Sequence, residues 1–171
     1  KSLLELGKRQ LALTPGDPHV HYDLALRYAQ LNELDQAITA FRNLMRVVPE
    51  SYDAYNDLGN VYFEKEEYQE AKNLYQQSLR IEPRFFQANY NLANLHLLAG
   101  ELDEAWDTYH RALEIHPDCA QIYSNLGIIC EKRGDDEEAI KKCEHAIFLN
   151  PFLPQAYNNL GVLYNKKGDR L

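Results

Sequence analysis

Apolar residues along this chain recur in short helical stripes that come in pairs, and residues 52–83 show the pattern most plainly. Two stripes with the spacing of an amphipathic helix, about 3.6 residues per turn, cover roughly 52–65 and 68–81, and Pro83 follows the second. Five prolines recur at one fixed interval, at Pro15, Pro49, Pro83, Pro117 and Pro151. A constant period of this length indicates that one helix–turn–helix repeat has been copied along the chain.

Each repeat is therefore predicted to hold two antiparallel helices, helix A followed by helix B. Asp17, Ser51 and Asp118 are expected to cap A helices, and Gly100 and Gly134 mark turns between the two helices of a repeat. The predicted organisation is one array: a half repeat with one helix B at 1–17, full repeats at 18–51, 52–85, 86–119 and 120–153, and a partial repeat with one helix A at 154–171, for which a capping role stays open.

Comparing the repeats position by position shows what the fold keeps constant. Helix A has a leucine column followed by a column that holds only Ala or Gly, and helix B has an alanine column followed four residues later by a column of larger side chains. Small residues let the backbones of two helices approach, and a large side chain fills the space beside them. These columns are Leu24, Leu58, Leu92, Leu126 and Leu160; Ala25, Gly59, Ala93, Gly127 and Gly161; Ala37, Ala71, Ala105 and Ala139; and Phe41, Tyr75, Tyr109 and Cys143.

The joint spacing of these columns resembles the tetratricopeptide repeat family, and the resemblance covers nearly the whole chain. It implies an all-α fold, a right-handed superhelical α-solenoid of antiparallel helix pairs with helix A on the concave side, and a role as a protein-binding scaffold. The matching residues are Tyr55, Leu58, Gly59, Tyr62, Ala71, Tyr75 and Pro83 in the second full repeat, and Tyr157, Leu160, Gly161 and Tyr164 in the partial repeat.

The chain departs from the family pattern at a few positions. Asn32 and Glu66 stand where a turn glycine is usual, and Ser78 and Leu44 replace a small alanine. Asp136 takes a position where an apolar residue is expected, at the start of helix B in the fourth full repeat.

Opposite its core stripe, helix A carries a second stripe that is rich in amides and poor in flexible charges. Asn91, Asn125 and Asn159 share one column of this stripe, and Asn60 and Asn94 share another. An amide can donate and accept hydrogen bonds, so a row of amides can pair with a peptide backbone. This resembles the asparagine ladder in the repeat domain of O-GlcNAc transferase; the alternative is that the amides bond to a neighbouring helix. The predicted peptide-binding residues are Asp23, Asp57, Asn60, Tyr90, Asn91, Asn94, Asn125, Ile128 and Asn159.

Composition narrows the class of partner and chemistry. The net charge of −8 argues against nucleic acid, whose phosphates require a basic face. Three cysteines without CxxC spacing suggest a reducing compartment, so a cytoplasmic location is expected, while a removed leader or a periplasmic location stays open. No apolar run is long enough for a membrane span. The sequence offers no nucleophile motif, phosphate-binding loop or set of metal ligands, so we expect no enzyme activity, cofactor or metal.

The sequence therefore predicts a scaffold that binds a peptide or a helix of a partner protein in its concave groove. Two alternatives stay open at this point. One is a structural module whose copies stack end to end as a homo-oligomer. The other is the substrate-recruiting part of a larger enzyme, such as a glycosyltransferase.

Overall fold

The computed structural model describes residues 2–168, in which the regular structure is α-helical and none of the helices has the length and apolar composition of a membrane span. The helices lie where the sequence predicts them, with ends that shift by one or two residues. They are α1 (Ser2–Leu13), α2 (Pro18–Gln30), α3 (Leu34–Val47), α4 (Tyr52–Glu64), α5 (Tyr68–Ile81), α6 (Phe86–Ala99), α7 (Leu102–Ile115), α8 (Ala120–Lys132), α9 (Asp136–Leu149) and α10 (Pro154–Gly168).

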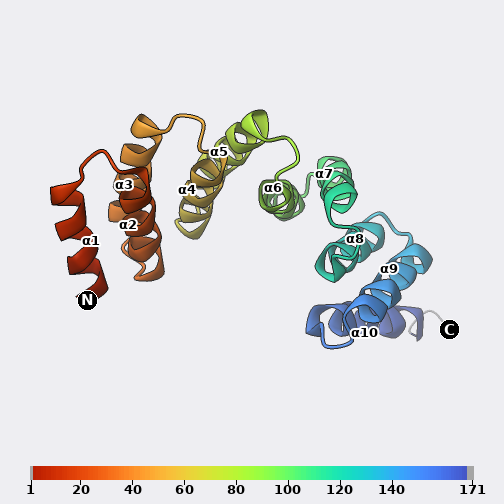
Figure 1. Ribbon diagram of the computed structural model, residues 1–171. Helices are drawn as coiled ribbons and strands as arrows, with labels where there is room; N and C mark the ends of the chain where they lie inside the picture. Colours follow the sequence, from red (N-terminus) through yellow and green to blue (C-terminus); the bar gives the residue numbers. More distant parts are fainter. Residues whose placement is uncertain (1, 169–171) are drawn as a thin grey trace. The chain divides into compact units, whose positions relative to one another are not determined.

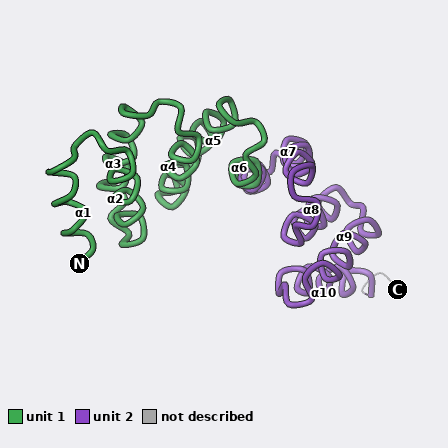
Figure 2. The backbone as a smooth tube through the Cα atoms, in the orientation of Figure 1, with its two compact units in different colours: residues 1–91 green, residues 92–171 purple. Residues whose placement is uncertain are grey.

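The chain forms two compact units, residues 1–91 and 92–171, called unit 1 and unit 2, and the boundary falls within α6 (Figure 2). In unit 1, α2 pairs with α3 and α4 pairs with α5, while α1 and α3 each pack against the A helix that follows (Figure 1). In unit 2, α8 pairs with α9, α7 packs against α8, and α10 packs against both α8 and α9. Each unit is thus built from A–B helix pairs stacked in chain order.

Helices A and B of a repeat approach each other closely at the helix A column that holds only Ala or Gly, as the sequence predicts. An ideal Cβ on Gly59 would stand 2.6 Å from the ring of Tyr75, and one on Gly127 would stand 2.8 Å from Cys143 Sγ. Tyr75 and Cys143 are buried in the column of larger side chains, as expected. A Cβ on Gly161 would meet nothing within 4 Å, since in the described chain α10 is not followed by the helix B of its own repeat.

The turns adopt the backbone conformation that the pattern predicts, with or without glycine. Gly100 and Gly134 have φ of 76° and 85°, and Asn32 and Glu66, at the equivalent positions, have φ of 58° and 62°. A left-handed conformation is unfavourable for residues with a Cβ, although Asn tolerates it better than Glu. The turn is therefore imposed by packing of the two helices rather than by the turn residue.

One of the three predicted N-caps is wrong. The Asp17 side chain accepts a hydrogen bond from the His19 N–H at 3.0 Å, which confirms that cap. Ser51 does precede α4, but its hydroxyl donates to Asp53 rather than accepting from the helix. Cys119, not Asp118, is the N-cap of α8 and makes no capping hydrogen bond, because the helix begins one residue later than expected.

A polar side chain six residues after the proline ties helix A to the preceding turn in three repeats. In each case the side chain donates a hydrogen bond to the carbonyl of the proline. This carbonyl lies between two helices and has no backbone partner within either of them. The bonds are His21 Nε2 to Pro15 O at 2.7 Å, Asn89 Nδ2 to Pro83 O at 3.1 Å, and Tyr157 Oη to Pro151 O at 3.1 Å.

Asp136 has a structural role that explains its place in an apolar column. Its carboxylate accepts a hydrogen bond from Lys166 Nζ at 2.7 Å, and the same ammonium lies 3.4 Å from Glu131. The three residues come from α9, α10 and α8, so one lysine joins three helices of unit 2. Burial of the Asp136 side chain, which is 18% exposed, is therefore compensated by its ion pair.

Candidate functional site

The predicted peptide-binding residues all lie on A helices. Asp23 is on α2, Asp57 and Asn60 are on α4, Ile128 is on α8, and Asn159 is on α10; α6 carries Tyr90, Asn91 and Asn94, and α8 also carries Asn125. Asp23 is exposed, and the other eight are partly buried. The amides are therefore neither sealed in the core nor simply free on the surface.

In unit 1 the amides form a hydrogen-bonded cluster, which we call the α4–α6 amide cluster, with Asn56, Asn60, Tyr75 and Asn91 as members. Asn91 Nδ2 donates to Asn56 Oδ1 at 3.0 Å and to Asn60 Oδ1 at 2.9 Å. The Tyr75 hydroxyl donates to the same Asn60 oxygen at 2.8 Å. Asn60 Oδ1 thus accepts two hydrogen bonds, and both N–H groups of Asn91 are in use.

Unit 2 has the same arrangement one repeat further along the chain, in the α6–α8 amide cluster, which consists of Asn94, Tyr109 and Asn125. Tyr109 Oη donates to Asn94 Oδ1 at 2.5 Å, and Asn125 Nδ2 donates to Asn94 Oδ1 at 3.1 Å. Asn125 Nδ2 also donates to Tyr109 Oη at 2.9 Å. Here the single tyrosine oxygen contacts both amides.

The two clusters leave the same pair of groups open to a ligand. Asn91 Oδ1 and Asn125 Oδ1 have no hydrogen-bond partner among the described residues, and neither do Asn60 Nδ2 and Asn94 Nδ2. In the described chain no fully buried side-chain polar atom lacks a partner, so these four groups are at least partly accessible to solvent. Each cluster therefore presents one carbonyl acceptor and one NH₂ donor.

At the C-terminal end of the amide stripe, Asn159 uses a different partner and stands beside an apolar pocket. Its Nδ2 donates to Ser124 Oγ at 3.1 Å. Ile128, Val162 and Asn159 line a pocket of about 180 Å³ between α8 and α10. Ile128 thus provides apolar surface next to an amide.

At the other end, Asp23 and Leu26 line a larger pocket of about 420 Å³ between α1 and α2. Asp23 also lies 3.9 Å from Arg27 one turn along α2. On α6, Tyr90 stacks on Phe86 with ring centroids 6.0 Å apart.

Asp57 is a partly buried carboxylate in the asparagine column. It accepts hydrogen bonds from the Tyr22 hydroxyl at 2.6 Å and from Asn56 Nδ2 at 3.0 Å. Burial raises the pKa of Asp57 above its ordinary value, and these two hydrogen bonds oppose the rise only in part. Burial also raises the pKa of Tyr22, so its hydroxyl remains a donor at neutral pH.

The Asp57→Asn variant is expected to be more stable than the wild type at pH 7, by on the order of 1 kcal/mol. A raised folded-state pKa favours folding at pH below the unfolded value of about 3.9, and this contribution is lost as pH rises through the folded value. Thermal melts between pH 4 and pH 7 should show a gap between variant and wild type that narrows toward acid. Asp23→Asn, an exposed change in the same column, is the control, and an equal gap in both variants would contradict the assignment.

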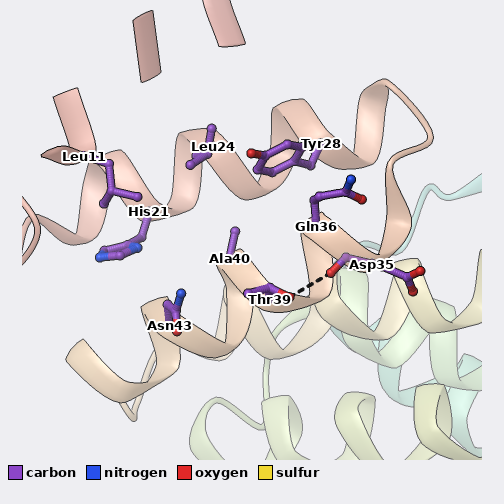
Figure 3. Close-up of a pocket in the computed structure, with 9 residues that line it drawn as sticks. All are labelled: Leu11, His21, Leu24, Tyr28, Asp35, Gln36, Thr39, Ala40 and Asn43. Atoms are coloured by element: carbon purple, nitrogen blue, oxygen red, sulfur yellow. Dashed lines mark hydrogen bonds between the residues drawn. The ribbon is translucent and has the colours of Figure 1, made fainter. Parts of the chain in front are cut away.

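A pocket outside the amide stripe was not predicted. It has a volume of about 420 Å³ and lies between α2 and α3, with Leu11 of α1 at one end (Figure 3). Leu24 and Tyr28 line it from α2, and Ala40 lines it from α3. The corresponding column reads Ala40, Leu74, Thr108 and Lys142, so the smallest side chain stands at the pocket, and this was the available sequence signal.

Tyr75 and Tyr109 were predicted only as packing residues, and Asn56 and Ser124 were not among the predicted site residues. A signal was present in the columns. The two repeats with Tyr75 and Tyr109 in helix B carry Asn60 and Asn94, respectively, in one column of helix A. The repeats with Phe41 and Cys143 at the same position of helix B carry Leu26 and Ile128, respectively, in that column. Likewise, the partner 35 residues before Asp57, Asn91 and Asn159 is always polar, namely Tyr22, Asn56 and Ser124.

Comparisons with known proteins agree with this architecture. Family models described as tetratricopeptide repeat match residues 22–71, 62–124 and 120–153. A comparison with curated protein sequences finds no match.

Three similar solved structures share the fold. A crystal structure of MamA aligns with a TM-score of 0.80 and 24% identity over 86% of each chain. YrrB, described as a TPR protein with an unusual peptide-binding site, aligns with a TM-score of 0.80 and 23% identity over 98% of this chain and 86% of that chain. MamA from Desulfovibrio magneticus RS-1 aligns with a TM-score of 0.81 and 18% identity over 89% of this chain and 86% of that chain.

Proposed function

Because the chain belongs to the tetratricopeptide repeat family of protein-interaction scaffolds, we propose that it binds an extended peptide segment of a partner protein along the amide stripe of its A helices, in the concave groove expected of this family. The observation that carries the proposal is the pair of open groups in each amide cluster. A carbonyl beside an NH₂ donor matches the N–H and C=O that every peptide residue offers. The backbone groups of a helical ligand are already paired with one another, so an extended segment is the better match.

A pocket beside the amide stripe in each unit supports the same function. In unit 1 the pocket at Asp23 and Leu26, and in unit 2 the pocket at Ile128 and Val162, can receive side chains of a segment whose main chain pairs with the amides of that unit. Main-chain pairing supplies affinity, and pockets for side chains supply specificity, as in other modes of extended-peptide recognition. The description of YrrB as peptide-binding supports a peptide as the ligand class.

Replacing Asn91 and Asn125 together by alanine should weaken peptide binding about tenfold or more, because each change removes one acceptor worth on the order of 1 kcal/mol. The probe is a peptide selected from a phage-displayed library of random sequences against the wild-type chain, and its Kd is measured by fluorescence polarisation. Circular dichroism establishes that the variant is folded at the assay temperature.

The matched control for this experiment is Asn73→Ala/Gln77→Ala, which removes two amides from α5, a B helix. These lie outside the amide stripe, so the control should bind as the wild type does. Equal affinity of the Asn91/Asn125 variant and the wild type would contradict the proposed site, and failure of the wild type to select any peptide would contradict the proposed function.

A further inference from the structure

The orientation of the amides is the property that a ligand would read, and the helix B tyrosines are placed to control it. An amide that flips end over end exchanges its donor and its acceptor, so the same asparagine can offer opposite groups to a ligand. We propose that Tyr109, and to a smaller degree Tyr75, is a positioning residue that stabilises the observed orientation of the amides, together with the hydrogen bonds between the amides themselves. This inference rests on the proposed function and identifies what makes the stripe selective for an unmodified main chain.

Tyr109 holds both amides of its cluster through one oxygen. It donates its only hydrogen to Asn94 Oδ1 at 2.5 Å and accepts from Asn125 Nδ2 at 2.9 Å. The first bond requires the Asn94 carbonyl to point inward, so its NH₂ points to solvent. The second requires the Asn125 NH₂ to point inward, so its carbonyl points to solvent.

Tyr75 has a narrower role, because Asn56 shares the task in unit 1. Tyr75 donates to Asn60 Oδ1 at 2.8 Å, whereas Asn91 Nδ2 is held by Asn56 Oδ1 at 3.0 Å. The Tyr75 ring is only 2% exposed, and burial raises the pKa of its hydroxyl, so the hydroxyl stays a donor at neutral pH. Loss of the hydroxyl therefore leaves Asn60 and Asn91 held by each other and by Asn56 in unit 1, whereas in unit 2 it leaves Asn94 and Asn125 held, among the described residues, only by each other.

The chain itself supplies a comparison for this assignment. In the two equivalent repeats that lack the hydroxyl, helix B carries Phe41 or Cys143, and the helix A column of Asn60 and Asn94 holds Leu26 or Ile128, so neither repeat has an amide to orient there. Both of these helix A residues line pockets instead. Helix B tyrosine and helix A asparagine thus occur together or not at all, which is expected if the hydroxyl serves the amide rather than the packing alone.

The ligand that fits these oriented groups is a peptide segment with free backbone N–H and C=O groups opposite the clusters. A residue with a methylated backbone nitrogen, or a proline, cannot donate to Asn125 Oδ1 or Asn91 Oδ1. Selectivity against such a residue is therefore the signature of correctly oriented amides.

The first test measures orientation without a ligand, by hydrogen exchange of the ¹⁵N-labelled side-chain NH₂ groups. In the wild type, the Asn125 NH₂ protons, both hydrogen-bonded, should exchange at least about tenfold more slowly than those of Asn94, which face solvent. In Tyr109→Phe this difference should shrink to within about twofold, whereas Tyr68→Phe, which removes a hydroxyl from the 40% exposed Tyr68, should leave it intact. An unchanged difference in Tyr109→Phe would overturn the inference.

The second test measures selectivity with a library-selected peptide and its scan of single N-methyl substitutions. The wild type should lose about tenfold in affinity on N-methylation at one or more positions. In Tyr109→Phe that loss should fall to about twofold or less, with a smaller reduction in Tyr75→Phe and none in Tyr68→Phe. If the wild type selects no peptide, the proposed function fails and this inference falls with it. If peptide binds and Tyr109→Phe discriminates as the wild type does, the inference alone is overturned, and the hydroxyl has only a structural role.

Discussion

Replacing Gly59 with alanine should lower the free energy of unfolding by about 1–3 kcal/mol, whereas the same replacement at Gly161 should raise it by about 0.5–1 kcal/mol. Both glycines occupy the small-residue column of helix A and differ only in what lies opposite. A Cβ at residue 59 would stand 2.6 Å from the Tyr75 ring, which is 2% exposed and held by its bond to Asn60, so the ring cannot move aside. At residue 161 nothing lies within 4 Å, so only the better helix propensity of alanine remains.

Urea denaturation followed by circular dichroism measures this pair of effects. Amide hydrogen exchange locates them, because the Gly59→Ala change should weaken protection in α4 and α5 first. Two changes of the same sign would show that helix propensity, and not the approach of helix B, decides this column.

The packing columns could be predicted because packing within a helix pair is local in sequence. Gly59 and Tyr75 belong to a single repeat, and the same spacing joins Gly127 to Cys143. A pattern that recurs in every repeat leaves little freedom in helix length or turn position. The ends of helices are less constrained, which is why Asp118 was assigned to a cap that Cys119 occupies.

The amide stripe was predicted as a set of positions, but its hydrogen bonds were not. Their partners come from other helices, 31 or 35 residues away for Asn91 and 15 residues away for the bond between Asn60 and Tyr75, and the columns do not indicate which group of each amide is used. Two readings that seemed to exclude each other, ligand contact and bonding to a neighbouring helix, are compatible. The NH₂ groups of Asn91 and Asn125 donate hydrogen bonds to neighbouring residues, and their side-chain carbonyls remain available to a ligand.

Asp136 shows a similar limit for single positions. The family pattern expects an apolar residue, and the sequence alone gives no reason for a carboxylate there. The reason is Lys166, 30 residues later, whose ammonium lies 2.7 Å from the carboxylate and joins α10 to α9. Such a pair can be recognised only after the helices have been placed, since the column of each residue taken alone does not indicate it.

Replacing Tyr109 with alanine should cause a larger loss, about 3–5 kcal/mol of unfolding free energy, with the damage centred on unit 2. The side chain is fully buried, so its removal leaves a cavity between helix B and the neighbouring A helices as well as two amides without their shared partner. Tyr109→Phe keeps the ring and should lose only about 1 kcal/mol, the contribution of the hydroxyl. Phe148→Ala, which removes an aromatic ring that is 80% exposed, should change stability by less than about 0.5 kcal/mol. Urea midpoints of the three variants order these effects, and a Tyr109→Phe loss as large as the Tyr109→Ala loss would mean that the hydrogen bonds, rather than the packed ring, hold this part of the array together.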